Sequence, residues 1–254
     1  MSYPDVAVVL LGAGYGTRLY PLTKDTPKAL LPIGERLLLD EIFEAVLQVP
    51  QRSTVTLVSN HVFAEQFRAW LKPQAVAVEV IDNGTQTPET RLGAIRDLWL
   101  ALERVSPDDD ALVLGTDNLF TWSLAEFVES ARRHRPAASI AVYDVASKVE
   151  ASRCAVVEMA RDHRLTSCVE KPKDPKSLTV GLCVYFFPAP IRKQIETFIR
   201  SGGNIDAPGY FMEWLVAHEP VYGFPTHGEW FDIGSPEAYQ EAVQRWAVVR
   251  PGRR

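Results

Sequence analysis

The stretch that decides the fold is VAVVLLGAGYGTRLYPLTKDTPKALLPIG, residues 6–34. Its β-branched run, Val6 to Leu11, predicts a buried strand that leads into a glycine-rich loop. Glycines after a strand let the backbone approach a ligand closely, and their N–H groups form an anion-binding nest. A tight strand-to-helix turn would fit the glycines alone equally well. The three glycines are Gly12, Gly14 and Gly16.

The loop is basic although the chain is acidic. Within residues 12–34, Arg18, Lys24 and Lys28 face one acid, Asp25. The whole chain has 27 Lys and Arg against 32 Asp and Glu, a net charge of -5. This balance argues against duplex nucleic acid or an anionic membrane as partner. Any phosphate site must therefore be local, and the loop is the candidate.

The spacing of the loop excludes two common nucleotide-binding motifs. A dinucleotide fingerprint needs GxGxxG opening a helix directly, but here the third glycine comes one residue early and Pro21 and Pro27 interrupt the continuation. A P-loop needs Lys-Ser/Thr after its last glycine, which is absent. A dinucleotide-dependent oxidoreductase is thereby excluded.

Strands and helices alternate outward from this loop. The alternation predicts a mostly parallel sheet in a three-layer α/β fold. Ser123, followed three residues later by Glu126, is typical of a helix N-terminus. After about residue 137 the chain becomes β-rich. Strands are expected at 54–59, 75–81, 111–114, 138–142, 154–159, 165–170 and 180–187, and helices at 37–47, 61–71, 93–105, 123–133, 191–199 and 210–217, with a last one begun by Ser235-Pro236-Glu237.

Length and composition fit one globular domain. The chain has 254 residues, 46% hydrophobic and 23% charged, which excludes a disordered or fibrous protein. Its three cysteines, Cys154, Cys168 and Cys183, have neither CxxC spacing nor an even count, so we expect a reducing compartment and no zinc site. The first apolar run is far shorter than the roughly 20 residues of a membrane span, and no basic leader precedes it. We expect a cytoplasmic protein with no membrane partner.

Four motifs in order give the chain a family resemblance. Gly16-Thr17-Arg18 is followed by Pro27-Lys28 and Leu31-Pro32-Ile33-Gly34, and later come LGTDNLF at 114–120, VEKP at 169–172 and WFDIG at 230–234. In these motifs the chain resembles the sugar-phosphate nucleotidyltransferases, the family of glucose-1-phosphate thymidylyltransferase. The resemblance implies a Rossmann-like mixed sheet in a single domain, residues 1–254. Its nucleotide-binding part would cover about 1–136, its acceptor-binding part about 137–234, and a C-terminal helix 235–250.

The resemblance also implies roles for individual residues. Arg18 would grip the triphosphate and Lys28 would lie near the α-phosphate, as the catalytic cations. Glu170 would bind acceptor hydroxyls, Lys171 would hold the acceptor phosphate, and Gly181 would line the acceptor pocket. The nucleotide would be bound by Leu11, Gly12, Ala13, Gly14, Gly16, Thr17, Arg18 and Gly93, the last of these letting the base approach closely.

Two separated acids are the candidate metal ligands. Asp117 follows a predicted strand and Asp232 precedes a predicted helix, and each by itself would more often be a turn or capping residue. Two such acids could jointly hold Mg²⁺, which favours one or two carboxylates with phosphate oxygens and water. The resemblance implies that Asp117 and Asp232 hold this cofactor.

The chemistry explains what the chain lacks. A phosphate monoester that attacks a nucleoside triphosphate is already anionic at neutral pH, so no Ser-His or Cys-His nucleophile is needed. None is evident, since there is no GxSxG and the five histidines are scattered. The reaction needs positioning, Mg²⁺ and cations that offset charge on the attacked phosphorus and the departing pyrophosphate.

Two departures leave the acceptor open. Thr116 and Ala155 stand where many relatives have glycine, so the acceptor pocket would differ in shape. The leading hypothesis is a sugar 1-phosphate acceptor; the alternative is a cytidylyltransferase for a choline-phosphate-like phosphate or phosphonate, with aromatic residues around the amine. A nucleotide-sensing regulatory protein without activity is a further alternative. The nucleotide base and the oligomeric state stay open, although many relatives are dimers or tetramers. Because the last motif ends at Gly234, we expect a single activity without a C-terminal repeat domain.

Overall fold

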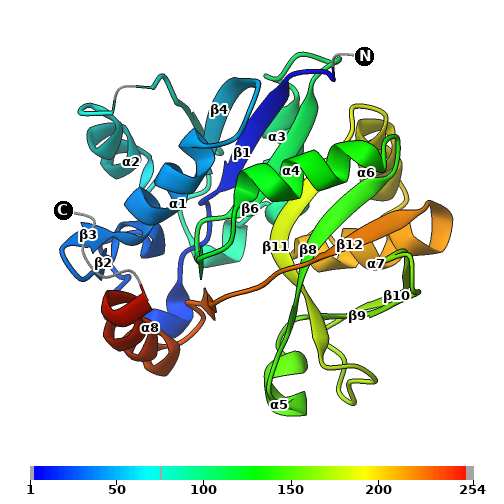
Figure 1. Cartoon of the computed structure of the whole chain (residues 1–254). Helices are drawn as coiled ribbons and strands as arrows, with labels where there is room; N and C mark the ends of the chain where they lie inside the picture. The colour runs from blue at the N-terminus through cyan, green and yellow to red at the C-terminus, as the bar shows by residue number, and fades with distance from the viewer. Residues whose placement is uncertain (1–2, 75, 250–254) are drawn as a thin grey trace.

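The centre of the molecule is one mixed β-sheet (Figure 1). A computed structural model describes residues 3–74 and 76–249. Among these residues the sheet has nine strands in the order β10-β9-β11-β6-β1-β4-β5, with β8 on β11 and β12 on β8. The strands are β1 (Val6–Leu11), β4 (Arg52–Ser59), β5 (Glu79–Asp82), β6 (Asp110–Gly115), β8 (Ala138–Asp144), β9 (Ala155–Met159), β10 (Leu165–Glu170), β11 (Thr179–Phe187) and β12 (Val221–Pro225).

The sheet has a parallel half and a second half whose pairs are antiparallel except for β12, which runs parallel to β8. In the parallel half β6, β1, β4 and β5 run side by side, with Leu10 opposite both Leu57 and Leu114. Strand β11 then runs antiparallel to β6 and also pairs with β8 and β9, so one strand joins the two halves. The predicted Rossmann-like mixed sheet is confirmed.

Helices cover both faces of the sheet and make the predicted three layers (Figure 1). Their apolar stripes bury residues such as Ile42, Phe67 and Phe127 against one face, and Leu98, Ile195 and Phe211 against the other. One face carries α1 (Leu38–Leu47), α2 (Ala64–Leu71) and α4 (Leu124–Arg133), and the other carries α3 (Ala94–Leu102), α6 (Ile191–Arg200) and α7 (Pro208–His218). The short α5 (Lys148–Ala151) precedes β9.

A smaller apolar cluster lies outside the main layers. It joins the C-terminal helix α8 (Pro236–Val249) to two short ladders, β2 (Pro32–Ile33) with β3 (Arg36–Leu37) and β7 (Asn118–Phe120) with β13 (Trp230–Asp232). Its buried members include Leu19, Leu119, Phe231 and Trp246. The sequence patterns did not predict these ladders or β12.

Several element boundaries differ from the prediction for local reasons. Helix α2 begins at Ala64 because the Asn60 side chain accepts a hydrogen bond from Phe63 N and holds the preceding turn. The strand expected at 75–81 is β5, which starts at Glu79, where pairing with Thr56 of β4 begins. Residue 75 of that prediction, and residue 250 of the predicted helix 235–250, lie outside the described residues. Ser123 caps α4 as predicted, accepting a hydrogen bond from Glu126 N.

Along residues 3–74 and 76–249, none of the helices combines the length and apolar character needed to cross a membrane.

Candidate active site

Lys28 ties the glycine-rich loop to the two candidate metal ligands. Its Nζ donates to Asp117 Oδ2 at 2.6 Å and to the carbonyl of Ile233 at 2.9 Å. Lys28 opens a 3₁₀ turn directly after Pro27, and only a third of the Asp117 side chain is exposed. Three segments that are far apart in the sequence therefore meet at one ammonium group.

The β7–β13 ladder brings the two acids together. Asn118 pairs with Asp232, and the N–H of Ile233 donates to the carbonyl of Asp117 at 3.0 Å. The Asn118 amide donates to Asp117 Oδ1 at 2.8 Å, while Trp230 Nε1 donates to Asn118 Oδ1, also at 2.8 Å. The indole thus fixes which way the Asn118 amide points, and the amide orients the Asp117 carboxylate.

The two carboxyls respond differently to this setting. Burial would raise the pKa of Asp117, but the Lys28 ammonium outweighs it and the pKa lies below its usual range. Burial and the Asp117 charge raise the pKa of Asp232 to about 6, against the lowering influence of Lys28, Arg18 and Lys171. The predicted cations of both halves therefore act on one acid.

Arg18 reaches the same point from the glycine-rich loop. A Cβ on Gly234 would lie 3.1 Å from Asp232 Oδ2 and 3.7 Å from Arg18 Nη2, so these groups converge beside Gly234. Arg18 sits in the 3₁₀ turn Thr17–Leu19, which the buried Leu19 anchors in the small apolar cluster.

The glycine-rich loop is anchored at its ends and open in its middle. The N–H of Gly12 donates to the carbonyl of Val58 at 2.9 Å, and Thr23 Oγ1 donates to the carbonyl of Gly16 at 2.7 Å. Gly16 adopts a φ of 62°, a conformation that favours glycine. A Cβ on the exposed Gly14 would meet nothing within 4 Å. A ligand can therefore approach the backbone at Gly14.

Gly93 and Leu11 have structural roles besides their predicted contacts with a base. Gly93 has a φ of 90°, and a Cβ there would lie 2.5 Å from the carbonyl oxygen of Ile205. The N–H of Ile95 donates to that same carbonyl at 3.1 Å. Thr116 donates to the carbonyl of Leu11 through both its N–H and its hydroxyl, at 3.3 and 3.1 Å. The contacts of Gly93 and Leu11 with a base stay predictions.

The predicted acceptor residues lie around the start of α7. Glu170 is buried, and Lys171 Nζ is 3.2 Å from its Oε1. Burial raises the pKa of Glu170, and the Lys171 charge opposes this shift. A Cβ on Gly209 would lie 1.8 Å from Glu170 Oε2, so only glycine leaves room for this carboxylate. A Cβ on Gly181 would lie 2.5 Å from the core side chain of Ile140, which explains that glycine by packing.

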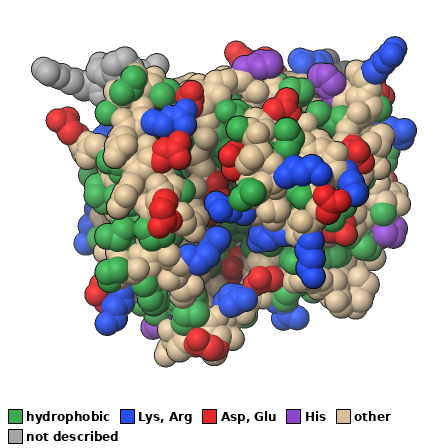
Figure 2. All heavy atoms as spheres, turned by 90° about the horizontal axis from the view of Figure 1, so that it is seen from below, with side chains coloured by type: hydrophobic (Ala, Val, Ile, Leu, Met, Phe, Trp, Pro, Cys, Tyr) green, Lys and Arg blue, Asp and Glu red, His purple; other side chains and the backbone are tan. Residues whose placement is uncertain are grey.

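One face of the molecule is hollowed. Figure 2 views the molecule from below Figure 1, the side towards which the carboxyl ends of the parallel strands point. The picture shows a hollow between two lobes, with lysine and arginine side chains around it and acidic ones at its floor. Ligands of α/β folds bind at this edge of the sheet.

Comparison with curated proteins finds relatives along nearly the whole chain. The chain is 29% identical over 236 residues to the mannose-1-phosphate guanylyltransferase catalytic subunit beta of Drosophila pseudoobscura pseudoobscura, covering 92% of this chain and 60% of that protein. It is 28% identical over 259 residues to the UTP–glucose-1-phosphate uridylyltransferase AglF of Haloferax volcanii, covering 93% and 95%. The chain thus spans about 60% of the length of the guanylyltransferase subunits that it matches.

Solved structures share the fold. A UDP-glucose pyrophosphorylase complexed with UDP-glucose superposes with a TM-score of 0.81 at 18% identity, covering 97% of this chain and 100% of that one. A UTP-bound UGPase from Acinetobacter baumannii gives 0.78 at 20% identity, covering 97% and 95%. The family model for nucleotidyl transferases matches residues 7–247. The chain belongs to the nucleotidyl transferase family.

Proposed function

We propose that the protein joins a nucleoside triphosphate to a sugar 1-phosphate and releases pyrophosphate and a nucleoside diphosphate sugar. The observation that carries the proposal is the Lys28 ammonium, which links the glycine-rich loop to Asp117 at 2.6 Å and opposes the rise in the pKa of Asp232. Relatives named for mannose 1-phosphate and glucose 1-phosphate support a sugar 1-phosphate as the acceptor.

The reaction would be an in-line displacement at the α-phosphorus. An anionic oxygen of the acceptor phosphate forms the new P–O bond, and the bond to the β-phosphate oxygen breaks, so that pyrophosphate leaves with the electron pair. Arg18 would bind the triphosphate, Lys28 would offset charge at the α-phosphate, and Lys171 would hold the attacking phosphate. Preorganised cations of this kind act mainly by electrostatic stabilisation of the transition state.

Asp117 and Asp232 suit a magnesium ion. Both donors are carboxylate oxygens, the ligand type that Mg²⁺ prefers, and burial together with the Asp117 charge raises the pKa of Asp232 to about 6. A magnesium ion held by Asp117 and Asp232 would offset negative charge on the triphosphate. We assign no further ligands to it.

The proposal leaves the base open, because the relatives are named for different nucleotides. We propose that the protein acts in the cytoplasm. Cys154, Cys168 and Cys183 are all free thiols in the structure, which is typical of proteins in reducing compartments.

The test is pyrophosphate release across five nucleoside triphosphates, ATP, CTP, GTP, UTP and dTTP, each with a panel of acceptors. The panel contains sugar 1-phosphates, phosphocholine and a phosphonate, so the alternative acceptor class is measured in the same experiment. The variants Asp117→Ala and Asp232→Ala should no longer release pyrophosphate. The control is Asp108→Ala, which removes an exposed acid just before the start of β6, at the end of the strand far from Asp117, and should keep the activity.

Two outcomes would contradict the proposal. Absence of release from every pair, by folded protein that still binds nucleotide, would favour the nucleotide-sensing alternative. Wild-type rates in Asp232→Ala would refute its assignment as a metal ligand.

A further inference from the structure

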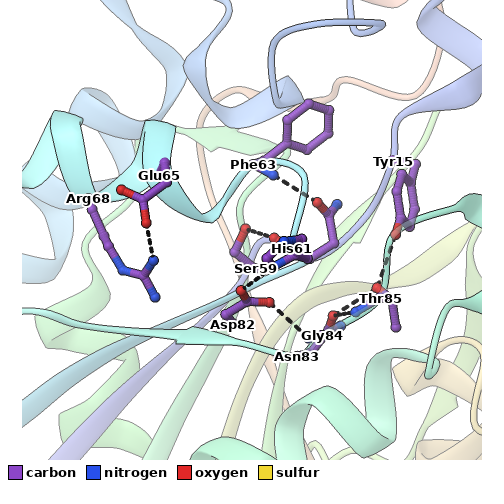
Figure 3. A network of polar contacts seen from close by, with 11 residues as sticks. Tyr15, Ser59, His61, Phe63, Glu65, Arg68, Asp82, Asn83, Gly84 and Thr85 are labelled. Atoms are coloured by element: carbon purple, nitrogen blue, oxygen red, sulfur yellow. Dashed lines mark hydrogen bonds and ion pairs between the residues drawn. The ribbon is translucent and has the colours of Figure 1, made fainter.

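A series of hydrogen bonds links the glycine-rich loop to the loop after β5 (Figure 3). It continues from that loop to helix α3. The Tyr15 hydroxyl donates to Thr85 Oγ1 at 3.0 Å. Thr85 donates to Asn83 Oδ1 through its hydroxyl at 2.7 Å and its N–H at 3.0 Å. Asn83 Nδ2 then donates to Asp97 Oδ1, in the first turn of α3, at 2.8 Å. Tyr15 lies in the glycine-rich stretch, but none of these four residues was among the candidate site residues of the sequence.

The carboxylate of Asp97, the last acceptor in this series of hydrogen bonds, sets the direction of each bond. An ionised carboxylate only accepts, so the Asn83 amide must turn its NH₂ group to Asp97 and its oxygen to Thr85. The Thr85 hydroxyl gives its one proton to that oxygen and keeps a lone pair for Tyr15. Tyr15 is left as an obligatory donor, and burial raises the pKa of its hydroxyl, which keeps the proton in place.

Burial makes each link costly to break. Tyr15 is 8% exposed, Thr85 6% and Asp97 7%. A buried donor or acceptor that loses its partner is penalised more than the bond itself contributes. The partial positive charge at the start of α3 favours a carboxylate at position 97. We therefore expect these hydrogen bonds to form and break together.

We propose that Tyr15 is a positioning residue that holds the glycine-rich loop in its nucleotide-binding shape, through Thr85, Asn83 and Asp97. The inference rests on the proposed function for the identity of the ligand. Tyr15 is the side chain between Gly14, which is open to a ligand, and Gly16, which turns the loop at a φ of 62°. Glycines lose more backbone freedom than other residues when they are ordered, so a fixed side chain between them reduces the cost of binding.

The test measures binding of the magnesium salts of the five nucleoside triphosphates by calorimetry, which needs no turnover. Tyr15→Phe removes one hydrogen bond and should raise the Kd about fivefold, the equivalent of one buried hydrogen bond. Thr85→Val removes the bonds of its hydroxyl to both Tyr15 and Asn83 and should raise the Kd by at least as much. In the double variant the loss should equal that of Thr85→Val alone, because that change already breaks the link to Tyr15. Tyr222→Phe, in β12 outside the network, should bind as the wild type.

A change in the KM for one substrate but not for the other distinguishes a positioning role from general damage to the fold. With any active pair of substrates, Tyr15→Phe should raise the KM for the nucleotide about fivefold and leave the KM for the acceptor unchanged. Asp97→Asn, whose amide can donate as well as accept, removes the fixed direction and should also weaken nucleotide binding.

The inference is overturned if both single variants bind every nucleotide within a factor of about two of the wild type. It is also overturned if the loss in the double variant equals the product of the two single losses, because the hydroxyls would then act independently. Wild-type protein that binds nucleotide but releases no pyrophosphate would refute the proposed function alone. Wild-type protein that binds none of the five nucleotides would refute both.

Discussion

The ammonium of Lys28 is the group on which the candidate site most depends at the scale of single residues. It lowers the pKa of Asp117 and opposes the rise in the pKa of Asp232, so its removal would change the electrostatic environment of both acids. Its bond to the Ile233 carbonyl also fixes the end of β13. One side chain thus carries an electrostatic and a geometric duty.

Lys28→Ala should lower kcat by about 10²- to 10³-fold, the usual cost of removing one preorganised charge at a transition state. The matched control is Lys24→Ala, which removes an exposed cation from the same loop and should leave kcat within a factor of about two. Steady-state pyrophosphate release measures both. Equal losses in the two variants would mean that only the net charge of the loop matters.

Asp97 should make stability depend on pH. Burial raises its pKa from 3.8 to about 6, so between these values the folded protein holds a proton that the unfolded chain has released. The free energy of unfolding therefore falls as pH rises from about 4 to 6, by about 3 kcal/mol from this group, and stays lowered above pH 6.

Asp97→Asn should remove that dependence. Denaturant unfolding at pH 4 and pH 7.5 should show the variant equal to the wild type at the lower pH and more stable at the higher one. The variant would then gain stability while it loses nucleotide binding, a trade-off often found at functional sites. A wild type that is no less stable than the variant at pH 7.5 would contradict the predicted penalty.

At the scale of elements, the short ladder of β7 and β13 matters more than any long helix. Its register sets Asp232 opposite Asn118 and next to Asp117. The reverse face of β13 is held by α8, where the rings of Phe231 and Trp246 meet edge to face at 6.0 Å. The C-terminal helix is therefore a support for the candidate metal site.

Trp246→Ala should loosen this support. Loss of a buried tryptophan costs about 3–5 kcal/mol, and here the cost falls on α8 and β13. We expect pyrophosphate release to fall at temperatures where the main sheet is still folded by circular dichroism. Val248→Ala, 76% exposed on the same helix, is the control and should change neither. Coincident loss of activity and of sheet signal in Trp246→Ala would argue against a local effect.

At the scale of the whole molecule, two halves share one sheet, and we propose that one binds the nucleotide and the other the acceptor. Strand β11 joins the halves by pairing with β6 on one side and with β8 and β9 on the other. The nucleotide half carries Tyr15 and Arg18, and the acceptor half carries Glu170 and Lys171. The two halves meet at Asp117 and Asp232.

If the halves divide the substrates in this way, a substitution in the acceptor half should affect only the acceptor, as Tyr15→Phe should affect only the nucleotide. Gly209→Ala sets a methyl where the Glu170 carboxylate lies, so the carboxylate must move and its pair with Lys171 is lost. We expect the KM for the acceptor to rise about tenfold, with the KM for the nucleotide unchanged. Kinetics with each substrate varied in turn measure the split. A rise in both KM values would contradict the division.

Much of this protein was determined by sequence alone. Strand and helix positions followed from local periodicity, because burial on one face leaves a repeat of two or of 3.6 residues. The mixed three-layer fold followed from their order. The motifs marked Arg18, Lys28, Asp117 and Asp232, which lie close together in the structure, because each motif is contiguous and chemically distinctive.

Only the tertiary structure decided how these groups meet. The β7–β13 ladder pairs short strands that are far apart in the sequence, and strands so short carry no periodic signal of their own. Gly209 in α7 leaves room for the carboxylate of Glu170 in β10, and Gly93 leaves room for the carbonyl of Ile205 in the segment before α7. The buried Asp97 looks like any acid on an amphipathic helix until Asn83 is seen against it. Such contacts depend on packing between segments distant in the chain, which no local pattern encodes.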